Sequence, residues 1–402
     1  MSTLLTHRPN QPPVDLERRR ALTGILEYAI ASLELTPAQR ESVEETYKEC
    51  GAHLAKALGL ATEKGDIFPQ GSMRLGTVIR PLRDITDVFD LDVVFRIVRL
   101  CTGCRPEELC AEVGAHLRTK YNGSVKPLPK GWRLDFSRER DYLLDVIPSM
   151  DSELGGNVIA ITDGKKWRNS NPRDYASWFE RHAAVLPRFE GDLIAFNEKR
   201  AFANSARIEP LPEHTEFKSP LQRIVQIAKR HRDHYFNKKT RQPTLLTPSI
   251  VVTTLLTHAY AANVARKVFQ SGFDLLLACV EDMVDYIEGT RIGERIEYRV
   301  QNPSLQSENL VEKWKDPRYA EAFFSWHRDF VTLLRQLVTH AAPHRQLLTE
   351  TLGERAVNTA FAKQAESFNT ARDRQILGFG ATGSLTINPV APVPRHVIHG
   401  LK

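Results

Sequence analysis

Two aspartates lie inside a segment that otherwise has the pattern of a buried β-strand. Asp90 and Asp92 interrupt the apolar run VFDLDVVFRI, and residues two apart on a strand point to the same face. Burial of unpaired carboxylates is unfavourable, because each loses its hydration. Divalent cations relieve this repulsion, and Mg²⁺ prefers oxygen ligands completed by water and phosphates. The pair therefore predicts a metal site, with a solvated sheet face as the alternative.

A third acidic residue occupies a second apolar run. Asp145 takes the place of a hydrophobic side chain in LLDVIP. On a strand beside Asp90 and Asp92, it would supply the further carboxylate that a two-metal site requires. We therefore expect these three residues to bind metal together and to carry out catalysis.

A Gly-Ser pair precedes the acids, with 17 residues between Ser72 and Asp90. Gly71 allows the backbone to approach a ligand closely, and Ser72 offers N–H and hydroxyl donors to phosphate oxygens at a predicted helix start. Arg74 adds positive charge nearby. Taken alone, this turn is also compatible with an ordinary N-cap. Its combination with three acids indicates an enzyme that acts on a phosphate-bearing substrate.

Short β-rich runs between about residues 66 and 150 must position these side chains. VFDLDVVFRI and YLLDVIP are predicted strands, and Pro148 is expected to end the second one. WRLDF is a further predicted strand, and RPEELCAEVGAHLRTKY is a predicted helix. The segment 151–205 is expected to be irregular.

Helices are predicted on both sides of the β-rich region. Upstream, one helix begins at Thr36 as N-cap, with Gln39 in the capping-box position, and ends at Gly59. From Ser219 onward, the apolar periodicity predicts helices up to about residue 371. The pattern predicts an α+β fold in three parts: a core with N-terminal helices over residues 1–205, a helical domain over 206–377, and a Gly/Pro-rich tail over 378–402.

The composition, 42% hydrophobic and 26% charged, is that of an ordinary soluble globular protein. A net charge of +6 fits a polyanionic ligand, either nucleoside triphosphates or nucleic acid, and equally a basic surface with no partner. The N-terminus lacks an apolar signal region, and no apolar run is long enough to span a bilayer. We expect a cytoplasmic protein that does not associate with membranes.

The stretches QGSMRLGT, DVFDLDVVF and LLDVIP together resemble the polymerase-β-like nucleotidyltransferases, whose signature is Gly-Ser, then Asp-x-Asp, then a third acid. The gap between Ser72 and Asp90 is similar to that of the bacterial cyclic oligonucleotide synthases related to cyclic GMP-AMP synthase, the CD-NTases. DGKKWRNSNPRDYASWF, SPLQRIVQIAKRHRDHYF and TPSIVVTTLLTHAY also resemble segments of that family. The resemblance implies a polymerase-β-like core, a mixed sheet with flanking helices, followed by a helical domain.

The resemblance also implies roles for matching residues. Asp90, Asp92 and Asp145 would hold two Mg²⁺ ions, with Mn²⁺ as an alternative. The donor triphosphate would be bound by Gln70, Gly71, Ser72, Arg74, Lys229 and Ser249. A solvated helix face explains Lys229 about as well. Candidates for base contacts are Asn169, Ser170 and Asn171, for which turn chemistry is an equally good explanation.

The implied activity is the joining of nucleoside triphosphates into a cyclic di- or trinucleotide second messenger, with release of pyrophosphate, in bacterial anti-phage (CBASS) signalling. ATP is the first expected substrate, with GTP or others as alternatives. A product-activated effector protein and an accessory regulatory protein are the expected partners. Two other functions fit the same motifs: transfer of nucleotides to RNA ends or of AMP to a protein, and a non-catalytic scaffold. Three retained acids argue against the scaffold.

Overall fold

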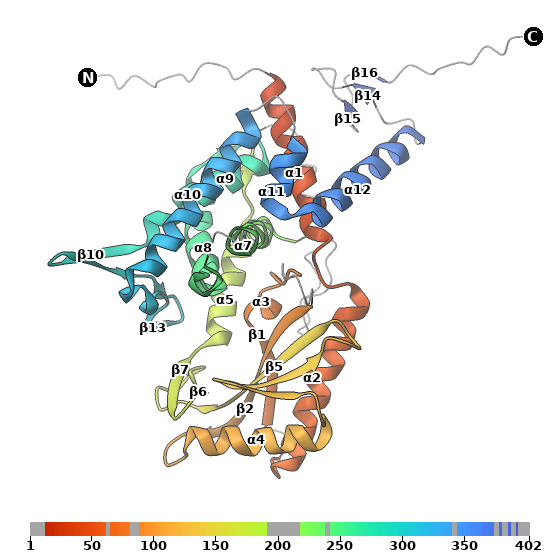
Figure 1. The fold of residues 1–402 in the computed structure, drawn as a ribbon. Helices are drawn as coiled ribbons and strands as arrows, with labels where there is room; N and C mark the ends of the chain where they lie inside the picture. The colour runs from red at the N-terminus through yellow and green to blue at the C-terminus, as the bar shows by residue number, and fades with distance from the viewer. Residues whose placement is uncertain are drawn as a thin grey trace, which may run out of the picture.

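The computed structural model describes residues 13–61, 65–80, 88–190, 218–237, 242–339 and 344–373, together with the pairs 378–379, 385–386 and 391–392. Figure 1 shows two halves, a β-sheet covered by helices and a group of packed helices, joined through helix α5 (Pro172–Ala183). Among the helices described, none combines the length and the apolar character needed to cross a membrane.

A seven-stranded mixed sheet forms the first half. Its main path is β1 (Gly65–Gln70), β2 (Phe89–Leu100), β5 (Tyr142–Asp151), β4 (Gly131–Phe136) and β3 (Val125–Leu128), and β6 (Ile159–Asp163) with β7 (Lys166–Ser170) continues from β5. The central strands β2 and β5 run parallel, whereas the other pairs of this sheet are antiparallel. This mixed sheet confirms the predicted α+β fold class.

Helices α2 (Pro37–Ala57) and α4 (Pro106–Lys120) cover the apolar face of the sheet (Figure 1). Leu91 and Val93 of β2 are fully buried in the cluster that these helices form with the strands. The predicted start of α2 is confirmed: Thr36 Oγ1 accepts from the Gln39 N–H at 3.2 Å, and the Gln39 side chain accepts from the Thr36 N–H at 3.0 Å. The helix therefore begins at a complete capping box.

Two predictions about the strands were wrong. Pro148 does not end β5, which continues to Asp151. Strand β4 pairs with β5 only as far as Val146, and β6 pairs with it from Ser149, so the proline without an N–H occupies the gap between two partners. The segment after 150 is also regular as far as the structure describes it, with β6, β7, α5 and β8 (Arg188–Phe189). Residues 191–205 lie outside the described residues.

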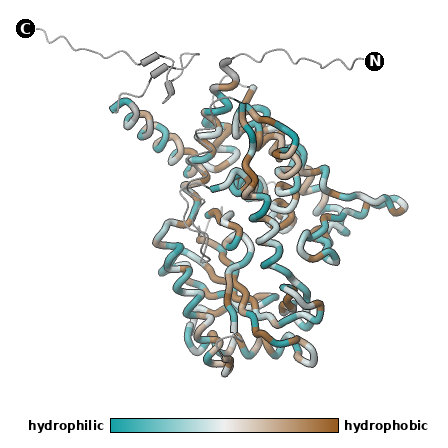
Figure 2. Tube along the Cα trace, turned by 180° about the vertical axis from the view of Figure 1, so that it is seen from behind, coloured by the Kyte–Doolittle hydropathy of each residue, from teal (hydrophilic) through white to brown (hydrophobic). Residues whose placement is uncertain are grey.

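The second half is helical, as predicted. It contains α1 (Pro13–Ala31), α7 (Pro220–Asn237), α8 (Ser249–Arg266), α9 (Gly272–Asp282), α10 (Pro317–Thr339), α11 (His344–Leu352) and α12 (Glu354–Asp373), with the short helices η1 (Pro243–Leu245), η2 (Met283–Tyr286) and η3 (Glu312–Lys315). Short strands accompany them: β9 (Val268–Phe269), β10 (Glu288–Ile292), β11 (Arg295–Arg299), β12 (Gln301–Asn302) and β13 (Leu305–Asn309). Figure 2 shows hydrophobic and polar stretches alternating along these helices, as expected for helices that pack on one another.

Helix α1 packs in the helical core, although it precedes the sheet in sequence. Leu22, Leu26 and Ile30 belong to the same buried cluster as residues of α7, α9 and α12. The proposed boundary between residues 205 and 206 lies outside the described residues, so the domain limits remain a proposal. Of the proposed tail, the structure describes three two-residue strands, β14 (Gly378–Phe379), β15 (Leu385–Thr386) and β16 (Ala391–Pro392), which form one small sheet.

Candidate active site

The three aspartates lie on two adjacent strands in the centre of the sheet. Asp92 of β2 is directly opposite Asp145 of β5 in the parallel register, and it is opposite Gln70 of β1 on the other side. Asp90 lies two residues earlier on β2 and shares the face of Asp92, while Leu91 between them is fully buried on the opposite face. The strand register therefore brings Asp145 beside the Asp90 and Asp92 pair, from which it is distant in sequence.

The Gly-Ser turn approaches these carboxylates directly. It forms a single helical turn, α3 (Gly71–Arg74), immediately after β1. Gly71 has φ +55, and a Cβ built on it would lie 3.4 Å from Asp92 Oδ2. Any other residue here would have a strained backbone, and its side chain would contact the acid cluster. Glycine therefore allows the turn to lie against the face of the sheet that carries the three acids. Ser72 follows within the same turn.

An arginine that was not predicted from the sequence lies in the acid cluster. Arg133 of β4 is opposite Asp145 in the antiparallel register. Its Nε donates to Asp145 Oδ1 at 2.7 Å, and its Nη2 donates to Asp145 Oδ2 and Asp90 Oδ1, both at 2.8 Å. The alternation in GWRLDF, with Trp132 and Leu134 buried, could have assigned its face. The sequence did not indicate which residues that face would meet.

Burial and mutual repulsion perturb the acids. The pKa of Asp92 is raised from 3.8 to about 7, chiefly by burial and then by the charges of Asp145 and Asp90. Burial likewise raises the pKa of Asp145, and the hydrogen bond from Arg133 opposes that rise. The cluster thus carries more negative charge than one guanidinium compensates, which is the condition that favours cation binding.

The donor chemistry of the cluster fits divalent ions such as Mg²⁺, which prefer carboxylate oxygens. Within the described part of the chain, no three acidic, His or Cys side chains already form a complete metal-ligand set. Arg133 explains this, because it occupies oxygens of Asp90 and Asp145 that an ion would need. The residues therefore fit a metal in kind, and the guanidinium competes with an ion for Asp90 Oδ1 and the oxygens of Asp145.

A groove of about 510 Å³ lies between the two halves next to the acids. Gln70, Gly71, Ser72 and Arg74 line its sheet side, and Lys229 and Ser249 line its helical side. These are the six residues for which the resemblance implied phosphate contacts. The side chain of Arg74 forms an ion pair with Glu180 of α5. Ser249 is the first residue of α8, and its Oγ accepts a hydrogen bond from Arg232 at 2.9 Å.

Lys229 does not lie on a solvated helix face, so that alternative was wrong. The residue is 6% exposed, and its Nζ donates to the carbonyl oxygen of Thr77 at 2.9 Å. Its pKa is lowered to about 8, mainly by burial and then by the charge of Arg232, while Asp92 acts in the opposite direction. The amine is therefore held close to the turn and within electrostatic range of the acids.

The three candidate base-contact residues also line the groove, but two of them have structural partners. Asn169 Oδ1 accepts from Ser152 Oγ at 2.7 Å. Asn171 caps α5 by accepting from the Asp174 N–H at 3.2 Å, and its Nδ2 donates to the Ser304 carbonyl at 3.2 Å. The second bond joins the sheet half to the loop between β12 and β13. No hydrogen bond of the Ser170 side chain is described.

The far wall of the groove was not predicted from the sequence. Residues of β12, β13 and η3 line it, including Asn302, Glu308 and Glu312. Arg168 of β7 reaches across to Glu312, with 3.1 Å between Nη2 and Oε2. These residues are far in sequence from every signature motif, and no motif among them indicated that they would line a groove.

Comparisons with known proteins agree with this geometry. Residues 24–182 match the family model "Second Messenger Oligonucleotide or Dinucleotide Synthetase domain". A curated relative, the c-di-GMP synthase of Roseivirga ehrenbergii, is 28% identical over 349 residues, which cover 83% of this chain and 85% of the relative.

Two solved structures show the same fold. The Bradyrhizobium diazoefficiens CD-NTase CdnG in complex with GTP has a TM-score of 0.62 and 17% identity, covering 88% of this chain and 100% of that one. The E. coli MS115-1 CdnC:HORMA-deltaN complex has a TM-score of 0.57 and 13% identity, covering 82% and 96%. Together these similarities indicate a bacterial CD-NTase, that is, a nucleotidyltransferase of the cyclic oligonucleotide synthase type.

Proposed function

We propose that the protein joins nucleoside triphosphates into a cyclic di- or trinucleotide in a Mg²⁺-dependent reaction, with GTP as the first substrate to test. The observation that carries this proposal is the convergence of Asp90, Asp92 and Asp145 beside the Gly71–Arg74 turn at the edge of a groove. GTP is favoured over ATP because the curated relative is named a c-di-GMP synthase and the CdnG structure contains GTP.

The residues have separate tasks in this reaction. Asp90, Asp92 and Asp145 would hold two divalent ions, which lower the pKa of the acceptor hydroxyl and neutralise the leaving pyrophosphate when bound. Ser72 and the backbone of its turn orient the donor triphosphate, and Lys229 supplies positive charge from the helical side. Asp145 would also orient or deprotonate the attacking hydroxyl.

We also propose that the product acts as a signal in bacterial anti-phage (CBASS) defence, where it would activate a separate effector protein. An accessory regulatory protein is a further proposed partner. The support for it is that the related CdnC was solved in a complex with HORMA-deltaN.

The test uses the purified full chain with Mg²⁺ and α-³²P-labelled GTP or ATP, alone and mixed. We expect pyrophosphate release and a small labelled product that resists phosphatase, with its mass given by mass spectrometry. The double variant Asp90→Ala/Asp92→Ala should give neither. Label that remains on RNA or protein would support the macromolecule-modifying alternative. Failure to bind any nucleotide in the presence of Mg²⁺ would support the scaffold.

A further inference from the structure

Side chains of α7 hold the backbone segment that follows the phosphate turn. Gln222 Nε2 donates to the Leu75 carbonyl at 2.9 Å, and Gln226 Nε2 donates to the Val78 carbonyl at 3.1 Å. Lys229 donates to Thr77 between them, as described above. Positions 222, 226 and 229 lie one turn apart on the same face of a helix. Three consecutive turns of α7 thus supply hydrogen-bond donors to a segment that is neither helix nor strand.

The backbone at Gly76 packs directly against the same side chains. Gly76 has φ +65, and a Cβ at this position would lie 2.6 Å from Gln222 Nε2 and 3.2 Å from Lys218 Nζ. No other residue type fits this conformation and this contact without displacing the glutamine. The distance between the turn and α7 is therefore fixed by glycine on one side and by Gln222 on the other.

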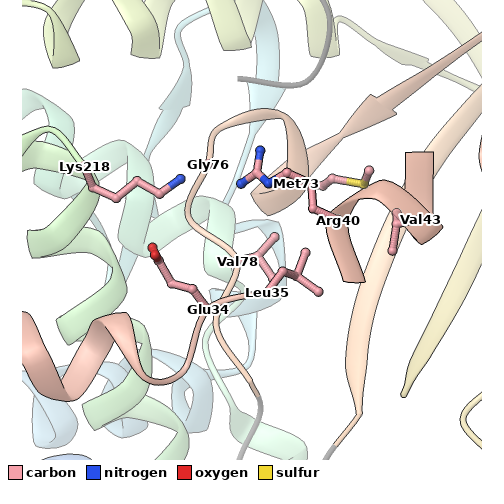
Figure 3. Close-up of a pocket in the computed structure, with 8 residues that line it drawn as sticks. All are labelled: Glu34, Leu35, Arg40, Val43, Met73, Gly76, Val78 and Lys218. Atoms are coloured by element: carbon pink, nitrogen blue, oxygen red, sulfur yellow. The ribbon is translucent and has the colours of Figure 1, made fainter. Parts of the chain in front are cut away.

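Little space remains behind the turn. Figure 3 shows the small cavity there, with Lys218 pointing toward the loop at Gly76 and with Glu34 and Arg40 nearby. Its volume of about 20 Å³ is close to that needed by one water molecule. Gln226 also donates to Glu34 Oε1 at 2.7 Å, so its amide is fixed by two acceptors. The segment cannot retreat from the groove without breaking these bonds.

We propose that Gln222 and Gln226 are positioning residues for the donor triphosphate. They hold the carbonyls of Leu75 and Val78, and so keep the preceding turn with Ser72 directed at the groove. The inference rests on the proposed function, because it assumes that the triphosphate binds at this turn. Helix α7 belongs to the helical half, whereas the three acids lie on the sheet. The packing of the helical half against the turn therefore determines how tightly the site binds nucleotide.

Gln222 allows the two roles of one side chain to be separated. Its Oε1 accepts from the Ser219 N–H at 2.9 Å, while Ser219 Oγ accepts from the Gln222 N–H at 3.2 Å, which is a capping box at the start of α7. Gln222→Glu keeps the acceptor for this cap, removes the donor to Leu75 and places a carboxylate oxygen against that carbonyl. The helix start is preserved, whereas the Leu75 carbonyl loses its partner.

The experiment compares wild type, Gln222→Glu and the control Gln346→Glu on the exposed face of α11. Calorimetry with Mg²⁺ and a non-hydrolysable α,β-methylene GTP should show about tenfold weaker binding for Gln222→Glu, the effect of one lost buried hydrogen bond. In steady-state assays KM for GTP should rise by about the same factor, with a smaller change in kcat. Hydrogen exchange of residues 72–80 should be faster in the nucleotide-free variant, and the control should match wild type in each measurement.

The outcomes distinguish the inference from the proposed function. Wild type that binds the analogue, together with a variant of equal affinity and unchanged exchange, overturns the inference alone. Wild type that binds no nucleotide overturns the proposed function and the inference with it. Where Gln222→Glu clearly lowers the melting temperature, Gln226→Met takes its place. It removes the donor to Val78 at a similar side-chain volume, together with the bond to Glu34 and the acceptor of Arg223.

Discussion

Asp92 should destabilise the metal-free protein at neutral and alkaline pH. Its pKa is raised from 3.8 to about 7 by burial and by two neighbouring acids. A carboxyl whose pKa is higher in the folded than in the unfolded state favours folding least when it is ionised. The free energy of unfolding should therefore fall as the pH rises from about 4, the unfolded value, to about 7, and stay low above that.

The size of the effect follows from the shift. A change of roughly 3 pKa units corresponds to at most about 4 kcal/mol, at 1.36 kcal/mol per unit. Because Asp92 is only partly buried in surface area, solvent screening lowers this value, and we take about 2 kcal/mol. For a chain of this size, that corresponds to a change in melting temperature of about 2 °C.

Thermal unfolding of wild type and Asp92→Asn in EDTA, between pH 5 and pH 8.5, measures this contribution. Asparagine keeps the size of the side chain and removes its charge, so the variant should melt about 2 °C higher than wild type at pH 8, with a smaller difference at pH 5. Glu112→Gln, on the exposed face of α4, is the control; it retains Asp92 and should melt like wild type at both pH values. Wild type should gain more stability than Asp92→Asn when Mg²⁺ and GTP are added. A variant that melts no higher than wild type at pH 8 without metal would refute the reasoning.

Three further predictions follow from the site. Arg133→Met should bind Mn²⁺ about tenfold more tightly than wild type in the absence of nucleotide, measured by electron paramagnetic resonance, because the guanidinium competes for oxygens of Asp90 and Asp145; equal affinities would contradict this. GTP affinity measured by calorimetry should decline as the pH rises through about 8, where Lys229 loses its charge, and Lys229→Arg should remove that decline. Asn171→Ala should lower the free energy of unfolding in urea by about 1–2 kcal/mol through loss of the α5 cap, whereas Asn171→Ser, which keeps a cap acceptor and adds no charge beside Asp174, should lose less.

The local patterns predicted the strands that carry the three acids well. Alternation placed Asp90 and Asp92 on one face of β2, and an acid within a second apolar run identified Asp145. Capping chemistry located the start of α2 at Thr36, because that signal lies within four residues. Each of these predictions depends only on residues that are close together in sequence, within one helix or strand.

Features that depend on pairing between elements were not predicted. Arg133 contacts Asp90 over a separation of 43 residues, and only the order of β2, β5 and β4 brings them together. Pro148 was expected to end a strand. The strand tolerates this proline because the pairing with β4 stops before it and the pairing with β6 begins after it, which the local sequence does not show. The wall formed by β12, β13 and η3 has no motif at all. The sequence of one helix or strand predicts which of its faces is apolar, but it does not predict which other element that face will contact.

The polar residues of α7 are buried, unlike those of a surface helix. Arg223, Gln226, Lys229 and Arg230 are each 6% exposed or less, so the face that periodicity assigns to solvent is buried. Burial of such groups is unfavourable unless each finds a partner. Backbone carbonyls of residues 75–80 supply these partners for Gln226, Lys229 and Arg230. The polar face of α7 and residues 75–80, which follow the Gly71–Arg74 turn, therefore stabilise each other, and this contact holds the two halves together beside the groove.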